Sequence, residues 1–282
     1  VNGSLKVLGS SGNRVVFTHS RDDAYGNPTD TNGDGSATLP SVSGTYRIFF
    51  NDQSVDTANV VRYAVFRFST YAIDLQQAAP TVTNCLFSKN TWGMRLNGVS
   101  GPTIDNSSFD NLTDAPVLMS LAANFTPTGT NVISGTTYRA IGIVNEVLAA
   151  DATMSKRNFA GVNNIPYLVS GLTVGTSSTL TIQPGVIVKF REYYGMTIQR
   201  GLQAIGGSHP DSTIVFTSDT DDFYGGDTNA DSTATSPYSG YWGGIVFDDL
   251  SYDPDCRIER AVVRYGGYSG GAIRMTNASP QF

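Results

Sequence analysis

Charged residues, cysteine, histidine and glutamate are all scarce in this chain. Only 15% of its 282 residues are charged, and glutamate occurs only at Glu146, Glu192 and Glu259. Runs of Ala, Leu, Glu and Lys with the 3.6-residue period of helices are therefore few. Gly, Thr, Ser, Asn and Val abound instead, which favours strands and turns. We predict an all-β chain, and an apolar fraction of 40% is enough to bury a core.

Basic residues are outnumbered by acidic ones. The formal net charge is -6 and the pI is near 4.8. Nucleic acids and anionic membrane surfaces both need a basic face, so we expect neither as a partner, whereas divalent cations fit. No run approaches the roughly 20 apolar residues of a membrane span, so we expect no membrane insertion. Val1 begins without a signal-peptide pattern, and we expect a mature or excised segment.

The two cysteines and two histidines are too dispersed to build a site. Cys85 and Cys256 lie at unrelated positions, which excludes a repeated disulfide framework. One bridge stays open as an alternative, but two buried thiols in strands are preferred. His19 and His209 are not equivalent, and without clustered Cys and His zinc is improbable. No G-x-S-x-G occurs, so a serine nucleophile is not indicated.

The chain does contain a long repeat. Val15–Phe50 and Ile214–Phe247 each hold a β-branched run, an acidic loop and then a strand with aromatic residues. The matching pairs are Phe17/Phe216, Thr18/Thr217, Asp22/Asp221, Asp23/Asp222, Tyr25/Tyr224, Gly26/Gly225, Asp30/Asp227, Asn32/Asn229, Asp34/Asp231 and Phe50/Phe247. We predict a repeat of about 200 residues, complete over 1–199 and partial over 200–282, with the second copy continuing the first.

A shorter period lies within the long repeat. Val60–Phe66, Thr81–Phe87 and Thr103–Phe109 follow one another at nearly equal steps. Short β-rich segments with such a period indicate a solenoid whose turns stack on their neighbours. We expect the closing phenylalanines to form a ladder, and Asn84 to lie above Asn106 at a turn. The predicted fold is a right-handed parallel β-helix with rungs of about 20–25 residues and acidic loop insertions.

The pattern is less regular in the middle of the chain. Between Ser120 and Val162 we expect irregular rungs, and Asn145–Met154 is the one stretch whose composition suits a short helix. Apolar alternation punctuated by glycine returns between Pro166 and Ser218. These residues are again predicted to be strands about 20 residues apart.

Five runs in this sequence resemble a known family. They are TLTIQPGVIVKF (179–190), GLQAIGG (201–207), IVFTSDTDDFYGGDTNAD (214–231), YWGGIVF (241–247) and VVRYGG (262–267). They resemble the right-handed parallel β-helix repeats of large bacterial surface and secreted proteins, a family that includes adhesins and stalk-like spacers. The resemblance implies an extracellular or cell-surface location and a structural or adhesive role.

The acidic loops carry a partial calcium motif. Asp30–Gly35 reads D-x-N-x-D-G, which is the first half of a calcium loop, and Asp227–Ser232 keeps its three oxygen ligands. Neither copy has the glutamate at position twelve, so an EF-hand is not implied. The candidate metal ligands are Asp22, Asp23, Asp30, Asn32, Asp34, Asp221, Asp222, Asp227, Asn229 and Asp231. We expect structural calcium, against the alternative of a solvated turn loop.

An enzyme on this scaffold is the main rival interpretation. A carbohydrate-cleaving β-helix uses paired acids or Arg with calcium, but Arg62 and Arg264 recur in V-R-Y of both copies, which indicates a structural position. We therefore assign no catalytic residue. Trp242 and Tyr46 are matched in the two copies, so packing explains them better than sugar stacking. The run REYYG at 191–195 is less regular, and a glycan contact there is a further hypothesis.

Neither end of the sequence offers the polar cap that a solenoid needs. We expect partners to be other copies or further repeats of the same protein, stacked end to end. A self-assembling filament or sheath subunit is therefore a third interpretation. The preferred prediction is a non-enzymatic extracellular segment of a surface or filament protein, stiffened by calcium.

Overall fold

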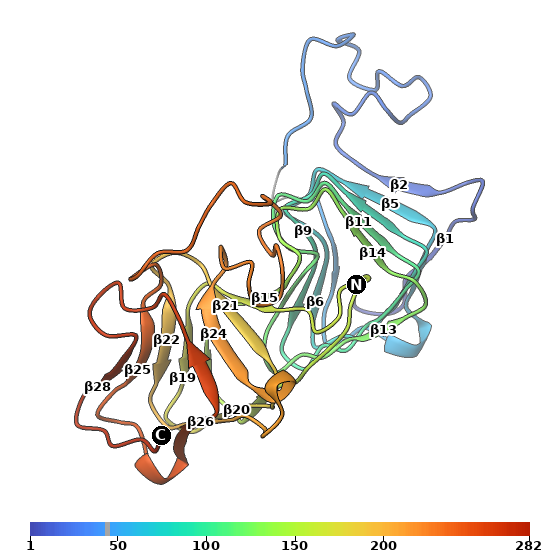
Figure 1. The fold of residues 1–282 in the computed structure, drawn as a ribbon. Coiled ribbons are helices and arrows are strands. Elements are labelled where there is room, and N and C mark those ends of the chain that lie inside the picture. The colour runs from blue at the N-terminus through green and yellow to red at the C-terminus, as the bar shows by residue number, and fades with distance from the viewer. Residues whose placement is uncertain (43–45) are drawn as a thin grey trace. The chain divides into compact units, whose positions relative to one another are not determined.

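The computed structural model describes residues 1–42 and 46–282, and it is a parallel β-solenoid of about ten turns. The all-β prediction is confirmed, because the described residues contain only three short 3-10 helices: η1 (Asp56–Ala58), η2 (Pro210–Ser212) and η3 (Asp253–Asp255). The chain forms two compact units (Figure 1). Unit 1 comprises residues 1–118 and 123–138, and unit 2 comprises residues 119–122 and 139–282.

Unit 1 is built from three parallel sheets that share the same turns. The first sheet contains β1 (Lys6–Leu8), β4 (Val60–Arg62), β7 (Thr81–Thr83), β10 (Thr103–Asp105) and β13 (Thr126–Thr128). The second contains β2 (Val15–Phe17), β5 (Ala64–Arg67), β8 (Leu86–Ser88), β11 (Ser108–Asp110) and β14 (Val132–Ser134). The third contains β3 (Ile48–Phe50), β6 (Tyr71–Gln76) and β9 (Trp92–Asn97), and the division between the units falls within β12 (Val117–Met119).

The predicted short period is confirmed by the strand register. Val60 pairs with Thr81, Thr81 with Thr103, and Thr103 with Thr126, so successive turns have nearly the same length. Each strand is only a few residues long, because a turn must bend back before it can stack. The solenoid is therefore stabilised by contacts between neighbouring turns.

The core of unit 1 contains the predicted aromatic ladder. Phe66, Phe87 and Phe109 are buried and stacked with ring centroids 5.3 and 4.9 Å apart, and Phe17 extends the stack at 5.0 Å. Parallel pairing in register places like side chains above one another, so a phenylalanine repeated once per turn becomes a continuous apolar column. Phe17, which belongs to the last strand of its sheet, is 36% exposed.

Asparagine shapes the corners of unit 1. Asn84 and Asn106 adopt left-handed φ angles of 54° and 45°, as suits the predicted turn position. Asn90 and Asn131 point inward instead. Their amide oxygens accept hydrogen bonds from the backbone N–H groups of Ser69 and Ser107, both at 2.9 Å, so the bent backbone does not leave buried donors unpaired.

Unit 2 has the same construction. Its first sheet contains β15 (Ile141–Ile143), β18 (Tyr167–Val169), β21 (Ile187–Phe190), β24 (Ile214–Ser218) and β27 (Ala261–Val263). The second contains β16 (Glu146–Leu148), β19 (Leu172–Val174), β22 (Gly195–Ile198), β25 (Gly244–Phe247) and β28 (Ile273–Met275). The third contains β17 (Ala152–Met154), β20 (Thr179–Ile182), β23 (Gly201–Ile205) and β26 (Cys256–Glu259).

The stretch considered for a short helix is strand in the structure. Asn145–Met154 contains β16 and β17, which pair in parallel with the following turn at β19 and β20. Stacking against that turn buries Leu148 and Met154, and this tertiary contact outweighs the local helix propensity of the segment.

The preference for two buried thiols is confirmed, although only Cys256 lies in a strand (β26) and Cys85 directly precedes β8. Cys85 and Cys256 are free and have exposed fractions of 2% and 0%. Burial raises the pKa of Cys85 to about 11, so this thiol stays protonated and inert near neutral pH. In the described ranges, no helix has the length and apolar character needed to cross a membrane.

Candidate metal centre in two repeated loops

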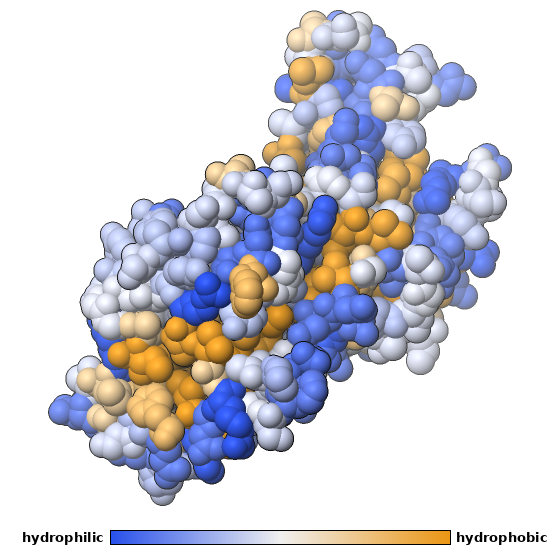
Figure 2. Space-filling view, viewed as in Figure 1, coloured by the Kyte–Doolittle hydropathy of each residue, from blue (hydrophilic) through white to orange (hydrophobic). Residues whose placement is uncertain are grey.

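Each unit carries one long insertion. Loop 1 joins β2 to β3 and covers residues 18–47, of which 18–42 and 46–47 are described, and loop 2 joins β24 to β25 and covers residues 219–243. Loop 1 leaves the strands that it connects (Figure 1), and in the space-filling view its colours are mostly hydrophilic (Figure 2). All ten residues predicted to be metal ligands lie in these two loops.

An aspartate at the start of the motif folds each loop locally. In loop 1 the Asp30 carboxylate accepts hydrogen bonds from the backbone N–H groups of Asp34 (3.1 Å) and Gly35 (2.8 Å). In loop 2 the carboxylate of Asp227 accepts the equivalent bonds from the N–H groups at positions 231 and 232, at 3.0 and 3.1 Å. Because these partners are four and five residues away, the sequence motif determines the conformation.

A second set of hydrogen bonds is also shared. The Thr235 hydroxyl donates to the Asp231 carboxylate at 2.5 Å and accepts from the Asn229 side-chain amide at 3.0 Å. In loop 1, Thr38 occupies the same position between the carboxylate of Asp34 and the amide of Asn32. The amide nitrogens thus face the threonines, which leaves the amide oxygens for other partners.

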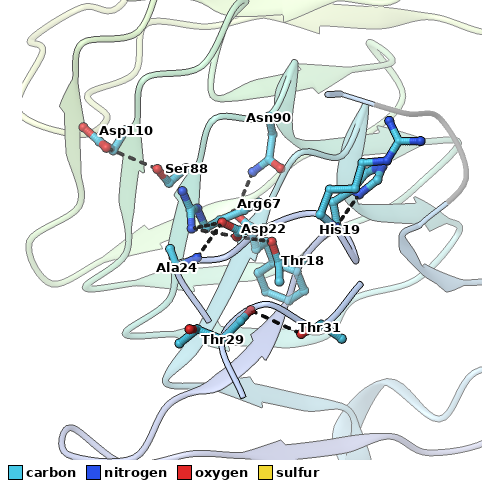
Figure 3. Close-up of polar contacts among 12 residues, drawn as sticks. Thr18, His19, Asp22, Ala24, Thr29, Thr31, Arg67, Ser88, Asn90 and Asp110 are labelled. Carbon is cyan, nitrogen blue, oxygen red and sulfur yellow. Dashed lines mark hydrogen bonds and ion pairs between the residues drawn. The ribbon is translucent and has the colours of Figure 1, made fainter. Parts of the chain in front are cut away.

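The base of loop 1 is fixed by Asp22. Its carboxylate accepts hydrogen bonds from the Thr18 hydroxyl and the Ala24 backbone N–H, and it receives Arg67 Nη1 at 2.6 and 2.9 Å (Figure 3). The side chains of Asp22 and Arg67 are 4% and 10% exposed, so this is a buried ion pair. The guanidinium carbon of Arg67 also lies 5.2 Å from the ring centroid of Tyr25.

Asp221 has the corresponding place in loop 2. It accepts hydrogen bonds from the Thr217 hydroxyl at 2.6 Å and the Phe223 backbone N–H at 3.2 Å. Arg264 Nη1 lies 3.4 Å from its carboxylate and is more exposed than its counterpart, with 31% of the side chain accessible. The guanidinium carbon of Arg264 lies 5.4 Å from the ring centroid of Tyr224.

The structure corrects the predicted match between Arg62 and Arg264. In the pairing of β2 with β5, Phe17 lies beside Phe66, and Arg67 is the next residue. In the pairing of β24 with β27, Phe216 lies beside Val263, and Arg264 is the next residue. Arg67 is therefore the equivalent of Arg264, and Arg62 is an exposed residue on β4. The two V-R-Y segments have identical letters, but they are not structurally equivalent. Equivalent residues are defined by how each strand pairs with the strand of the neighbouring turn.

Loop 2 gathers three of the predicted ligands. Carboxylate oxygens of Asp222, Asp227 and Asp231 all lie within 4.8 Å of one another, and no other described group of acidic, cysteine and histidine side chains is as close. One oxygen each of Asp222, Asn229 and Asp231 is buried from solvent and has no hydrogen-bond donor. Uncompensated buried oxygens are costly, so these four side chains fit a bound cation.

Loop 1 also has buried carboxylate oxygens without hydrogen-bond donors, but its carboxylates are not gathered as closely as those of loop 2. Oxygens of Asp23 and Asp34, the equivalents of Asp222 and Asp231, are also buried without a hydrogen-bond donor. Burial followed by the charge of Asp30 raises the pKa of Asp23. Burial and then the charge of a neighbouring aspartate raise the pKa of Asp222 in the same way, which indicates that like charges face one another in both loops.

Lys189 on β21 is a buried contact of loop 2 that the sequence reasoning missed. Its side chain is fully buried, and Nζ donates hydrogen bonds to the backbone carbonyls of Asp221 (2.9 Å) and Gly226 (3.0 Å) in loop 2. Burial lowers the pKa of Lys189 to about 8. The negative charge of Asp221 is the largest of the effects that act in the opposite direction and raise this pKa. The signal available in the sequence was a lone lysine inside the apolar run Ile187–Phe190.

The arrangement is suited to a hard divalent cation. The gathered donors are all oxygen atoms, which Ca²⁺ and Mg²⁺ prefer, and no nitrogen or sulfur ligand joins them in the described residues. Asp22 and Asp221 are committed to arginines rather than to the gathered group. Asn32 is exposed, whereas Asn229 contributes a buried oxygen.

Fold and loops together define a parallel β-solenoid with acidic insertions that are held by arginine at their base. No protein-family model, curated protein or solved structure matched this chain.

Proposed function

We propose that this protein is a non-enzymatic, structural or adhesive β-solenoid of the extracellular space or cell surface, stiffened by calcium in loops 1 and 2. The observation that carries the proposal is the set of buried oxygens without donors, which includes Asp23 and Asp34 in loop 1 and Asp222 and Asp231 in loop 2. A cation relieves both the missing hydrogen bonds and the repulsion among the carboxylates.

Calcium suits these loops better than other common cations. Asp222, Asp227 and Asp231 would hold the ion, and Asn229 adds an amide oxygen. Bound calcium would neutralise the carboxylates and fix the insertion. Ca²⁺ accepts variable numbers of oxygen ligands in flexible geometry, whereas Mg²⁺ demands a near-ideal octahedron and retains its waters. The donor set lacks the thiolates and imidazoles that select zinc.

The repetition of the loops supports a structural role. The same backbone and side-chain hydrogen bonds occur in both copies, including the arginine at the base. A catalytic arrangement is normally built once, whereas a bracing element gains from each repetition. The adhesin-like, secreted bacterial character of the proposal rests on the sequence resemblance together with the solenoid fold.

We also propose that copies or repeats of this protein associate end to end. Strands β1, β2 and β3 are each the last strand of their sheet and carry exposed apolar side chains: Leu8 at 53%, Phe17 at 36% and Phe49 at 37%. Such an edge is a template for another strand. Sedimentation velocity over a range of protein concentrations tests this, and a monomer at all concentrations counts against the filament interpretation.

Thermal unfolding in calcium and in chelator tests the metal proposal. At calcium concentrations of about 100 times Kd, a single site stabilises the folded state by about 2.7 kcal/mol. At about 2–4 °C per kcal/mol for a chain of this size, chelation should lower the midpoint by several degrees. Titration calorimetry with CaCl₂ then counts the sites.

Two double variants make the test specific. Asp227→Ala/Asp231→Ala should lose the calcium response of loop 2, whereas Asp52→Ala/Asp249→Ala, which removes two exposed acids outside the loops, should keep it. If calcium leaves the midpoint of the wild-type protein unchanged, the loops are solvated turns and the proposal fails. If the Asp227→Ala/Asp231→Ala variant responds like the wild type, the ion binds elsewhere.

A further inference from the structure

Three stacked corners of unit 2 bring tyrosines together. The corners are residues 191–194 between β21 and β22, residues 238–243 before β25, and residues 264–272 between β27 and β28. The Tyr193 backbone N–H donates to the Tyr241 carbonyl at 2.9 Å, and the Tyr241 N–H donates to the Tyr265 carbonyl at 2.8 Å. The tyrosines are thus held one turn apart by the backbone.

The rings form a connected, exposed group, which we call the tyrosine cluster: Tyr193, Tyr238, Tyr241 and Tyr268. The rings of Tyr193 and Tyr268 are 4.5 Å apart with an interplanar angle of 60°, and those of Tyr238 and Tyr241 are 5.2 Å apart at 71°. Tyr193, Tyr238 and Tyr268 are 55%, 48% and 58% exposed. Each ring therefore presents a face or an edge to solvent while it contacts a neighbour.

Glu192 links the two halves of the tyrosine cluster. Its carboxylate accepts a hydrogen bond from the Tyr238 hydroxyl at 2.5 Å. This hydrogen bond is the main cause that raises the pKa of Tyr238 to about 12, and a hydrogen bond to Glu192 likewise raises the pKa of Tyr193. The phenols therefore stay protonated, and the carboxylate orients two rings in advance of any ligand.

The solenoid scaffold does not require this cluster. Loop 1 and loop 2 share a proline near their ends, Pro40 and Pro237, but the next residue is Ser41 in loop 1 and Tyr238 in loop 2. In the same loop Trp242 is fully buried, as a packing role demands, while its tyrosine neighbours are not. Tyrosines that are half exposed and not repeated point to recognition rather than packing.

The chemistry of the cluster favours a neutral, hydroxyl-rich ligand. Every exposed large apolar side chain on the three corners is a tyrosine, so the aliphatic surface typical of protein partners is missing from the described corners. Glu192 disfavours an anionic ligand, while Arg264 on the third corner and Arg274 on β28, which donates to the Ser269 carbonyl of that corner at 3.2 Å, disfavour a cation. A pyranose ring has C–H faces that stack on aromatic rings and hydroxyls that bond to phenols and carboxylate.

We propose that the tyrosine cluster is a binding site for neutral glycans, with rings of Tyr193 and Tyr268 as the stacking surface and Glu192 as a hydroxyl acceptor. This function is additional to calcium stiffening and uses tyrosines such as Tyr238, whose counterpart in the first copy of the repeat is Ser41. It would let the solenoid attach to a polysaccharide without a cleft.

The test is a printed array of neutral and charged glycans, followed by titration calorimetry with the neutral glycan that binds best, all in excess calcium. Tyr193→Ala/Tyr268→Ala should weaken binding by about tenfold or more, because aromatic anchors dominate such contacts. Tyr252→Ala removes a tyrosine that is 50% exposed and stacked on Arg200 elsewhere in unit 2, and it should bind like the wild type. Glu192→Gln keeps an acceptor without the charge and should weaken binding by a few-fold.

Three outcomes overturn the proposal. The first is that no neutral glycan on the array is bound. The second is that only charged glycans, or tetramethylammonium chloride added as a cation probe, bind the protein. The third is that the Tyr193→Ala/Tyr268→Ala variant, with an unchanged melting midpoint, binds the glycan as the wild type does. Loss of calcium binding in the Asp227→Ala/Asp231→Ala variant leaves these outcomes unaffected when the melting midpoint is maintained, so the two proposals can fail separately.

Discussion

Loops 1 and 2 have nearly the same internal structure but are attached to their strands in different ways. Loop 1 is held by the buried pair of Arg67 and Asp22 near its start and by the ion pair of Arg47 with buried Asp74 at its end, while its acidic part is largely exposed. Loop 2 has a longer and more exposed arginine contact, but its carbonyls also receive Lys189, and its Thr228 carbonyl accepts the Arg139 backbone N–H at 2.8 Å. Among the described residues, the acidic part of the insertion is therefore tied to the strands by one strong contact in loop 1 and by several contacts in loop 2.

The reason for the difference lies in the neighbouring turns. Strand β2 is the last strand of its sheet, so only β5 is beside it, whereas β24 lies between β21 and β27. Loop 2 can consequently rest on the preceding strand, which supplies Lys189, and on the end of the following strand, where Arg264 comes directly after β27. Local sequence determines how an insertion folds, and stacking position determines how firmly it is held.

The largest expected effect comes from Arg67→Ala. The substitution leaves the buried Asp22 carboxylate without its countercharge, which costs about 3–5 kcal/mol of unfolding free energy. Arg264 is half-buried and lies farther from its partner, so we expect Arg264→Ala to cost about 1 kcal/mol or less. Urea unfolding measures both.

Arg62→Ala is the matched control for these variants. Arg62 is exposed, and its removal should change the unfolding free energy by no more than about 0.5 kcal/mol. Equal losses in Arg67→Ala and Arg264→Ala would contradict the contrast in anchoring between the two loops.

Lys189→Met should have an intermediate effect confined to loop 2. Methionine has a similar length but no donor, so the carbonyls of Asp221 and Gly226 lose their buried partner at a cost of about 1–3 kcal/mol. Hydrogen exchange should become faster in loop 2 and stay the same in loop 1. Lys156→Met, at an exposed lysine that also bonds a carbonyl, serves as the control. Unchanged exchange in loop 2 would show that Lys189 does not anchor it.

The smallest expected effect comes from exchanging glycines between the loops. Gly33 and Gly35 have φ of 70° and 71°, and their equivalents Ala230 and Ser232 have φ of 54° and 62°. Left-handed backbone costs an L-residue about 1–2 kcal/mol, so Ala230→Gly should stabilise unit 2 and Gly33→Ala should destabilise unit 1 by about 1 kcal/mol each. Differential scanning calorimetry measures the change in melting temperature. If Ala230→Gly destabilised the protein or Gly33→Ala stabilised it, the two loops would differ in backbone conformation as well as in anchoring.

Sequence reasoning succeeded where the relevant partners are near in the chain or recur at a fixed step. The short period of the sequence corresponds directly to the strand pairs, and the D-x-N-x-D-G motif corresponds to bonds between Asp30 and residues four and five positions later. The expectation of buried thiols at Cys85 and Cys256 rested on the general tendency of unpaired cysteine to be buried.

Sequence reasoning failed where the partner comes from another turn. The match of Arg62 with Arg264 used identical letters, but the ion pairs form across turns whose lengths differ, so letter identity misplaced the residue. Lys189 was missed because its partners are 32 and 37 residues away. The strands of Asn145–Met154 were uncertain because their burial depends on the following turn.

The two insertions also affect the order in which the chain folds. Lys6 pairs with Val60 across loop 1 and Leu202 pairs with Cys256 across loop 2, and each of these segments is more than twice as long as the plain turn that pairs Val60 with Thr81. Closing the longer segments costs about 0.8 kcal/mol more in chain entropy, since each doubling of length adds about 0.6 kcal/mol. We expect the short turns to nucleate first and the turns that carry loops 1 and 2 to join last, so bound cations would act on the final, slowest association of each unit.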